Sequence, residues 1–90
     1  MEKTLQSVSV DGMKYSLIQV WDDEPGSYVD LVGVEESSGL RRLDVRGDTR
    51  YGREPLVKGS YGTVSSDVVN SFLPRRRATV VSLLTCAGAL

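Results

Sequence analysis

Alternating apolar and polar positions dominate the first half of the chain and predict extended strands. Residues 4–10 and 13–21 both alternate, and Asp11-Gly12 joins them. A two-residue Asp-Gly link between extended runs is the strongest local signal of a β-hairpin. By the period of two, the second run places two sets of side chains on opposite faces: Met13, Tyr15, Leu17, Gln19 and Trp21 against Lys14, Ser16, Ile18 and Val20.

Turn residues then separate further extended runs. Pro25-Gly26 suits the centre of a type II turn, because proline presets the first dihedral and glycine accepts the positive second one. A third strand is expected over residues 28–35, and Ser37-Ser38-Gly39 is the next break. Residues 40–46 alternate again, and a short fifth strand is expected within residues 56–64. The alternation puts Leu43 and Val45 on one face of the fourth strand and Arg42, Asp44 and Arg46 on the other.

The periodicity changes after residue 64. Ser65-Ser66-Asp67 before Val68 and Val69 is compatible with a capped helical turn or with the end of a strand. Pro74 is typical of a first helical turn, whereas Thr79-Val80-Val81 weakly favours a strand. We expect a helix over residues 75–87, with its apolar stripe made by Val80, Val81, Leu83, Leu84, Ala87 and Leu90.

These elements predict an α+β fold in which an antiparallel meander of about five strands is followed by a C-terminal helix. The whole chain, residues 1–90, is expected to be one domain, with strands in 1–64 and a helical segment in 65–90. A chain of 90 residues buries only about 60 to 65% of its unfolded surface, so its stability as a monomer is marginal. Self-association is therefore expected.

Composition narrows the classes of function. The chain has no histidine and one cysteine, Cys86, so the usual zinc sites, internal disulfides and histidine-dependent triads are excluded. We expect no catalytic residues, no metal and no cofactor, and we expect Cys86 to act as a small hydrophobe on the helix. The N-terminus lacks a signal-like apolar run, and no stretch approaches the roughly 20 apolar residues of a membrane span. An intracellular or viral protein without a membrane segment is expected.

Charge is divided unevenly along the chain. Residues 1–39 hold two lysines against eight acids, a net charge of −6, and residues 40–90 hold nine basic groups against four acids, a net charge of +5. Eight of those nine basic groups are arginine, whose planar guanidinium suits phosphate and stacks on bases. Either this half binds nucleic acid, or it is a solvated face balanced by the acidic half of the same chain or of a neighbour.

The candidate nucleic-acid-binding residues are the arginines of this half and one aromatic ring among them. Arg42 and Arg46 are expected on one strand face, and Tyr51 is placed to stack on bases. The run from Arg75 to Arg77 stands at a helix start, which prefers acids, so an acidic neighbour or a phosphate is expected to neutralise it. The full set is Arg41, Arg42, Arg46, Arg50, Tyr51, Arg53, Arg75, Arg76 and Arg77.

The order of elements resembles the coat proteins of single-stranded RNA bacteriophages. The stretches that carry the resemblance are TLQSVSVDGMKYSLIQV, GLRRLDVRGDTR, and FLP followed by RATVVSLLTCAGAL. It implies an antiparallel sheet with C-terminal helices, an intertwined homodimer in which helices of one chain cover the sheet of the other, and an opposite sheet face that binds an RNA hairpin. Arg42 and Arg46 would then face RNA, and the helix from Arg75 would be the dimer element. The chain departs from the family in its shorter length and in its short region 47–71.

That resemblance implies a non-enzymatic capsid protein that assembles with itself and binds RNA, located in the virion or the host cytoplasm. A second similarity competes with it, because KYSL, YVDL and PLVKGSYGTV are similar to segments of the single-stranded DNA-binding proteins of filamentous phages. Those are dimeric five-stranded barrels, and Tyr15, Tyr28 and Tyr61 would be the stacking rings. A third reading is a small protein-interaction or inhibitor module that docks through its acidic and basic halves.

Overall fold

The structure is a computed structural model that describes residues 1–21, 27–48, 56–60 and 62–90. Its strands are β1 (Glu2–Val10), β2 (Met13–Trp21), β3 (Ser27–Glu35), β4 (Arg41–Asp48) and β5 (Leu56–Ser60). Two helices follow, α1 (Ser66–Ser71) and α2 (Pro74–Cys86). The predicted α+β order is confirmed. The segment 65–73, which the sequence left open between strand and helix, contains α1.

The five strands form one antiparallel sheet in the order β1-β2-β3-β4-β5. Asp11 and Gly12 both have positive φ, 50° and 78°, as the tightest two-residue hairpin turn requires. The predicted hairpin is therefore confirmed, whereas the turn expected at Pro25-Gly26 lies outside the described residues. β1 and β5 lie at opposite edges, so the described strands form an open sheet. This differs from the closed barrel that the similarity to DNA-binding proteins implies.

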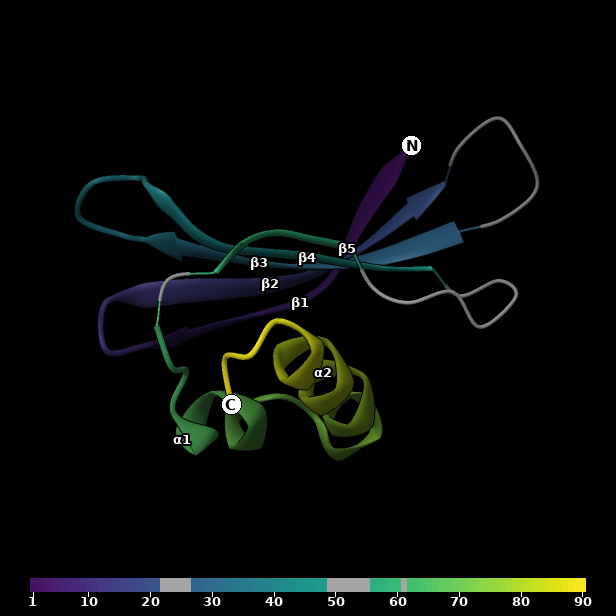
Figure 1. Cartoon of the computed structure of the whole chain (residues 1–90). Coiled ribbons are helices and arrows are strands. Elements are labelled where there is room, and N and C mark those ends of the chain that lie inside the picture. Colours follow the sequence, from purple (N-terminus) through teal and green to yellow (C-terminus); the bar gives the residue numbers. More distant parts are fainter. Residues whose placement is uncertain (22–26, 49–55, 61) are drawn as a thin grey trace.

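Both helices lie on the same side of the sheet and make the molecule two layers thick (Figure 1). The core between the layers includes a row of residues in register across three strands, Leu17, Leu31 and Val45. Leu83 of α2 approaches β4 so closely that a Cβ on Gly47 would lie 2.9 Å from its Cδ2. Close helix-to-strand packing at this point therefore depends on glycine.

The apolar stripe predicted for the second helix is correct only in part. Val80, Leu83 and Leu84 are buried in the core, but Val81 is 39% exposed and Leu90 is 49% exposed. Cys86 is also exposed, so the expectation that it packs as a small hydrophobe is wrong. The buried face of α2 is therefore narrower than the apolar stripe predicted from the sequence.

Polar contacts hold the helical layer together and join it to the sheet at one point. The side chain of Ser65 caps α1 by accepting a hydrogen bond from the Asp67 amide at 3.2 Å. Between the helices, the Leu73 amide donates to Oε1 of Gln6 on β1 at 3.2 Å. The Val64 amide donates to the carbonyl of Ala89 at 2.6 Å, which ties the segment before α1 to the C-terminal end of the chain.

Candidate functional site

The face of the sheet opposite the helices, called the open face below, is the place where the sequence predicts binding. The helices leave this face uncovered (Figure 1). Of the charged residues whose side chains the structure describes, the strand register assigns three cations to this face, Lys14, Arg41 and Arg46, and three acids, Glu2, Asp30 and Asp44. The charges of these six side chains balance, although the second half of the chain is basic as a whole.

Arg46 lies near the middle of the open face and is held by its neighbours on β3. Its Nε and Nη2 donate to the two carboxylate oxygens of Asp30 at 2.8 and 2.9 Å, directly across the strand pair. The guanidinium also lies 4.9 Å from the ring centroid of Tyr28. A bidentate pair of this kind is strong and directional, and the ring adds a cation–π contact. The charge of Arg46 is therefore neutralised within the sheet.

Arg41 is more accessible than Arg46. Its Nη1 donates to Oδ2 of Asp44 at 3.0 Å, and its side chain is 61% exposed, against 26% for that of Arg46. The other oxygen of this carboxylate, Oδ1 of Asp44, is buried and has no hydrogen-bond partner among the described residues. Arg41 thus stabilises a buried acid through one hydrogen bond and presents the rest of its guanidinium to solvent.

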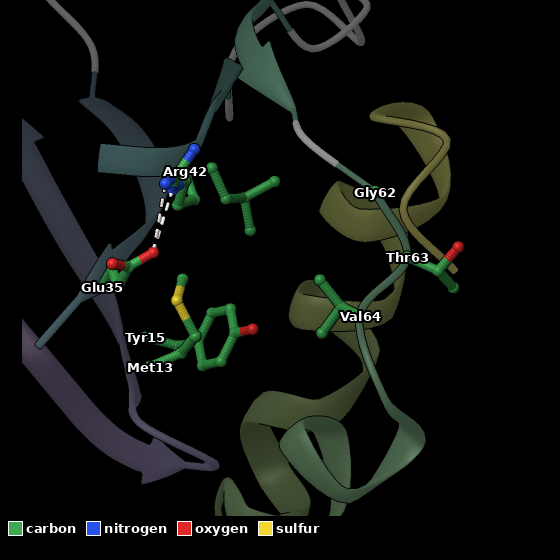
Figure 2. Close-up of a pocket in the computed structure, with 8 residues that line it drawn as sticks. Met13, Tyr15, Glu35, Arg42, Gly62, Thr63 and Val64 are labelled. Carbon is green, nitrogen blue, oxygen red and sulfur yellow. Dashed lines mark hydrogen bonds and ion pairs between the residues drawn. The ribbon is translucent and has the colours of Figure 1, made fainter. Parts of the chain in front are cut away.

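Arg42 does not share the face of Arg46, contrary to the prediction from alternation. A β-bulge interrupts the pairing of β3 and β4 between Gly33 and Val34, where Gly33 pairs with Leu43 and Val34 with Arg41. Arg42 is the extra residue, and it lines a cavity together with the core residue Tyr15 on the helix-covered side (Figure 2). A bulge inserts one residue and shifts the alternation beyond it, so the simple period of two assigned this arginine to the wrong face.

Arg42 pairs with Glu35 at the end of β3. Its Nε and Nη2 each lie 3.2 Å from Oε2 of that carboxylate. Ser38 and Ser37 donate to Oε1 at 2.9 and 3.2 Å. These hydroxyl groups first, and Arg42 after them, lower the pKa of Glu35 below its usual 4.5. Glu35 is consequently an anion that is hydrogen-bonded from both sides.

The three arginines at the start of α2 have different environments. Arg77 donates from Nε to the carbonyl of Phe72 at 3.0 Å and from Nη2 to the carbonyl of Asn70 at 3.1 Å. It therefore satisfies carbonyls at the C-terminal end of α1, where cations are favourable. Arg75 is exposed, and Arg76 is partly buried with no hydrogen-bond partner for Nε among the described residues. Arg77 is thus paired with backbone carbonyls and not with the acidic neighbour or phosphate that the sequence predicts.

The remaining candidates divide between described and undescribed residues. Arg50, Tyr51 and Arg53 lie outside the described residues, as does Tyr61 of the alternative set of rings. Of the other two rings in that set, Tyr15 is in the core at 7% exposure and Tyr28 is on the open face beside Arg46. The structure therefore does not place Tyr15 and Tyr28 on one surface, as base stacking along a strand would require.

A shallow hollow on the open face was missed by the sequence analysis. It has a volume of about 470 Å³ and an apolar floor made by Ile18, Val32 and Val34. Lys14 and Arg41 stand at its rim. The sequence could have indicated this hollow, because alternation in β2 places the apolar Ile18 on the face opposite Leu17.

We also searched the described residues for a metal site and for a membrane-spanning helix. They contain no group of three or more histidine, cysteine, aspartate or glutamate side chains that could hold a metal ion. Within them no helix is long and apolar enough to cross a membrane. Comparisons with family models, curated proteins and solved structures found no match to this chain. Function is therefore inferred from the geometry of the open face.

Proposed function

We propose that the chain is a non-enzymatic structural protein that assembles with itself and binds RNA across the open face of its sheet, as the coat proteins of single-stranded RNA phages do. The observation that carries the proposal is the one-sided fold. Two helices cover one face of a five-stranded sheet, and the other face stays open (Figure 1). Its cations lie on two strands, Lys14 on β2 and Arg41 and Arg46 on β4. A twisted sheet with hydroxyl and basic side chains is a surface that can contact several phosphates at once.

The geometry narrows the residues that would contact phosphate. Arg46 has a bidentate acidic partner, so we assign it to holding β3 and β4 together. Lys14 is exposed, and Arg41 gives only one hydrogen bond to Asp44 and is 61% exposed. Lys14 and Arg41 are therefore the proposed phosphate contacts, and Ser7 and Ser16, whose hydroxyls lie 2.8 Å apart, are polar neighbours on the same face.

The first experiment is a light-scattering mass measurement on protein purified without nuclease, with ultraviolet absorbance to detect nucleic acid. A capsid-forming protein is expected to elute as very large particles that contain RNA. A small oligomer that contains no nucleic acid, and that stays small when RNA is added, would overturn the proposal.

The chain offers matched control variants for a binding titration with single-stranded RNA. Lys14→Gln and Arg41→Gln are each expected to reduce the slope of log affinity against log salt by about 0.7, the value for one phosphate contact on a single strand. Lys3→Gln and Arg42→Gln remove cations on the opposite side of the sheet, so their slopes are expected to match that of the wild type. Lys3 is placed there by its pairing with Gln19, and Arg42 by the cavity that it lines with Tyr15 and Leu43. Equal effects of all four substitutions would exclude the open face as the RNA site.

A protein partner is the second candidate, and the hollow over Ile18, Val32 and Val34 favours it. An apolar centre with a polar rim is typical of protein docking surfaces, and the balanced charges of the open face would suit a mixed surface better than a polyanion. In that case binding of RNA would be undetectable, whereas Val32→Asp would abolish self-association or capture of the partner protein.

A further inference from the structure

A second cavity lies on the opposite side of the sheet from the open face, beside residues 62–64, which precede α1. Its volume is about 310 Å³. Met13 and Leu43 line it from the sheet, and Gly62, Thr63 and Val64 line it from the segment before α1. The Val64 wall is fixed by the hydrogen bond from its amide to the Ala89 carbonyl. The cavity is therefore built from parts of the chain that are distant in sequence.

Tyr15 supplies a polar group to this cavity. Its side chain is 7% exposed, and Figure 2 shows the hydroxyl pointing into the space towards Val64. The ring lies across Gly33, where an added Cβ would be 3.0 Å from Cδ1 and Cε1. The hydroxyl makes no hydrogen bond to another described residue, and its oxygen is not fully buried. It can therefore donate a hydrogen bond to a molecule that enters the cavity.

Arg42 supplies a positive charge at the edge of the same cavity (Figure 2). Its Nε donates to Oε2 of Glu35 and its Nη2 lies 3.2 Å from the same oxygen, which keeps the guanidinium in place beside the cavity. Its side chain is 42% exposed, so the remaining donors are accessible to a small molecule. Arginine binds carboxylates through such pairs of donors.

We propose that this cavity binds a small carboxylic acid with an apolar body. The carboxylate accepts hydrogen bonds from Arg42 and from the hydroxyl of Tyr15, and the apolar body packs against Met13, Leu43 and Val64. The lining is mixed. Arg42 and the Tyr15 hydroxyl are its donors, and its one carboxylate, Glu35, is paired with Arg42 and hydrogen-bonded by Ser37 and Ser38, so the donors favour an anionic acceptor. The volume is at the lower end of the range for small-molecule sites. This site does not depend on the proposed RNA-binding function, because it lies on the other side of the sheet.

The test is a titration of the full chain with phenylacetate, followed by backbone amide NMR. Saturable shifts are expected at Met13, Leu43 and Val64. Arg42→Gln is expected to weaken binding of phenylacetate roughly tenfold, as loss of a charge-assisted hydrogen bond would. Phenylacetamide has the same ring and no charge. Its affinity for the wild type is expected to be about as low as the affinity of phenylacetate for Arg42→Gln.

Two further variants separate the site from general effects. Tyr15→Phe keeps the ring and removes only the hydroxyl, and it is expected to weaken phenylacetate binding roughly fivefold. Arg41→Gln removes the neighbouring arginine, whose partner Asp44 is on the open face, and it is expected to leave the affinity unchanged. The proposal is overturned if the shifts do not saturate, or if Arg41→Gln and Arg42→Gln weaken binding equally.

Discussion

Replacing Arg77 with alanine tests why an arginine run stands at the start of α2. The substitution removes the hydrogen bonds to the carbonyls of Phe72 and Asn70, at 3.0 and 3.1 Å. Each such bond contributes about 0.5–1.5 kcal/mol. Removing a cation from a helix N-terminus returns about 0.3–1 kcal/mol, and alanine keeps the helix propensity high. The expected net loss of unfolding free energy is about 1.5 kcal/mol, which lowers Tm by roughly 6–12 °C for a domain of this size.

The assay is urea and thermal unfolding followed by circular dichroism, with Arg75→Ala as the matched control. Arg75 is exposed two positions earlier on the same helical turn. Its removal is expected to stabilise the fold by about 0.3 kcal/mol, because only the unfavourable charge at the helix start is lost. If the two variants unfold at the same urea concentration and temperature, Arg77 does not hold the end of α1 and the reasoning is wrong.

Three other changes test the sheet and its core. Asp30→Ala is expected to cost about 1–3 kcal/mol because it leaves Arg46 without its bidentate partner, and adding Arg46→Met should restore part of that loss in urea unfolding. Gly33→Ala places a Cβ 3.0 Å from ring atoms of Tyr15 and is expected to cost about 1–3 kcal/mol, so an unchanged unfolding midpoint would contradict the packing. Burial, and after it Asp11, raises the pKa of Tyr15 above its usual 10.0, so the stability that this group contributes is fully present below pH 10 and is lost as pH rises through the folded pKa. In an ultraviolet titration of tyrosine ionisation, Tyr15→Phe should therefore remove a component that ionises above pH 10. An unchanged titration curve would contradict the assignment.

The strands could be predicted from the sequence because local chemistry determines them. Asp11-Gly12 fixes one turn through two positive φ values, and alternation in β2 follows directly from the pleat. The helix pattern after Pro74 was equally readable. The width of its buried stripe was not, because only the position of α2 over β4 decides that Val81 stays exposed.

The site was harder to predict because it depends on contacts between strands. Arg46 and Asp30 are 16 positions apart, and only the register of β3 against β4 brings them together. The sequence therefore indicated a basic face and could not show that its central arginine is neutralised. Arg77 likewise has partners on a different helix, which a rule about helix dipoles applied to α2 alone does not include.

Arg41 and Arg42 are neighbours in sequence, and the bulge beside them directs them to opposite sides of the sheet. Comparing the two glutamine variants in both binding assays therefore tests the two proposals separately. Arg41→Gln should lower the salt dependence of RNA binding and leave phenylacetate binding intact. Arg42→Gln should leave the salt dependence of RNA binding unchanged and weaken phenylacetate binding. If Arg41→Gln has no effect on RNA while Arg42→Gln still weakens phenylacetate binding, the RNA proposal fails and the carboxylate site stands. If each variant affects both ligands, the bulge does not separate the two side chains, and the strand register between β3 and β4 is wrong at this point.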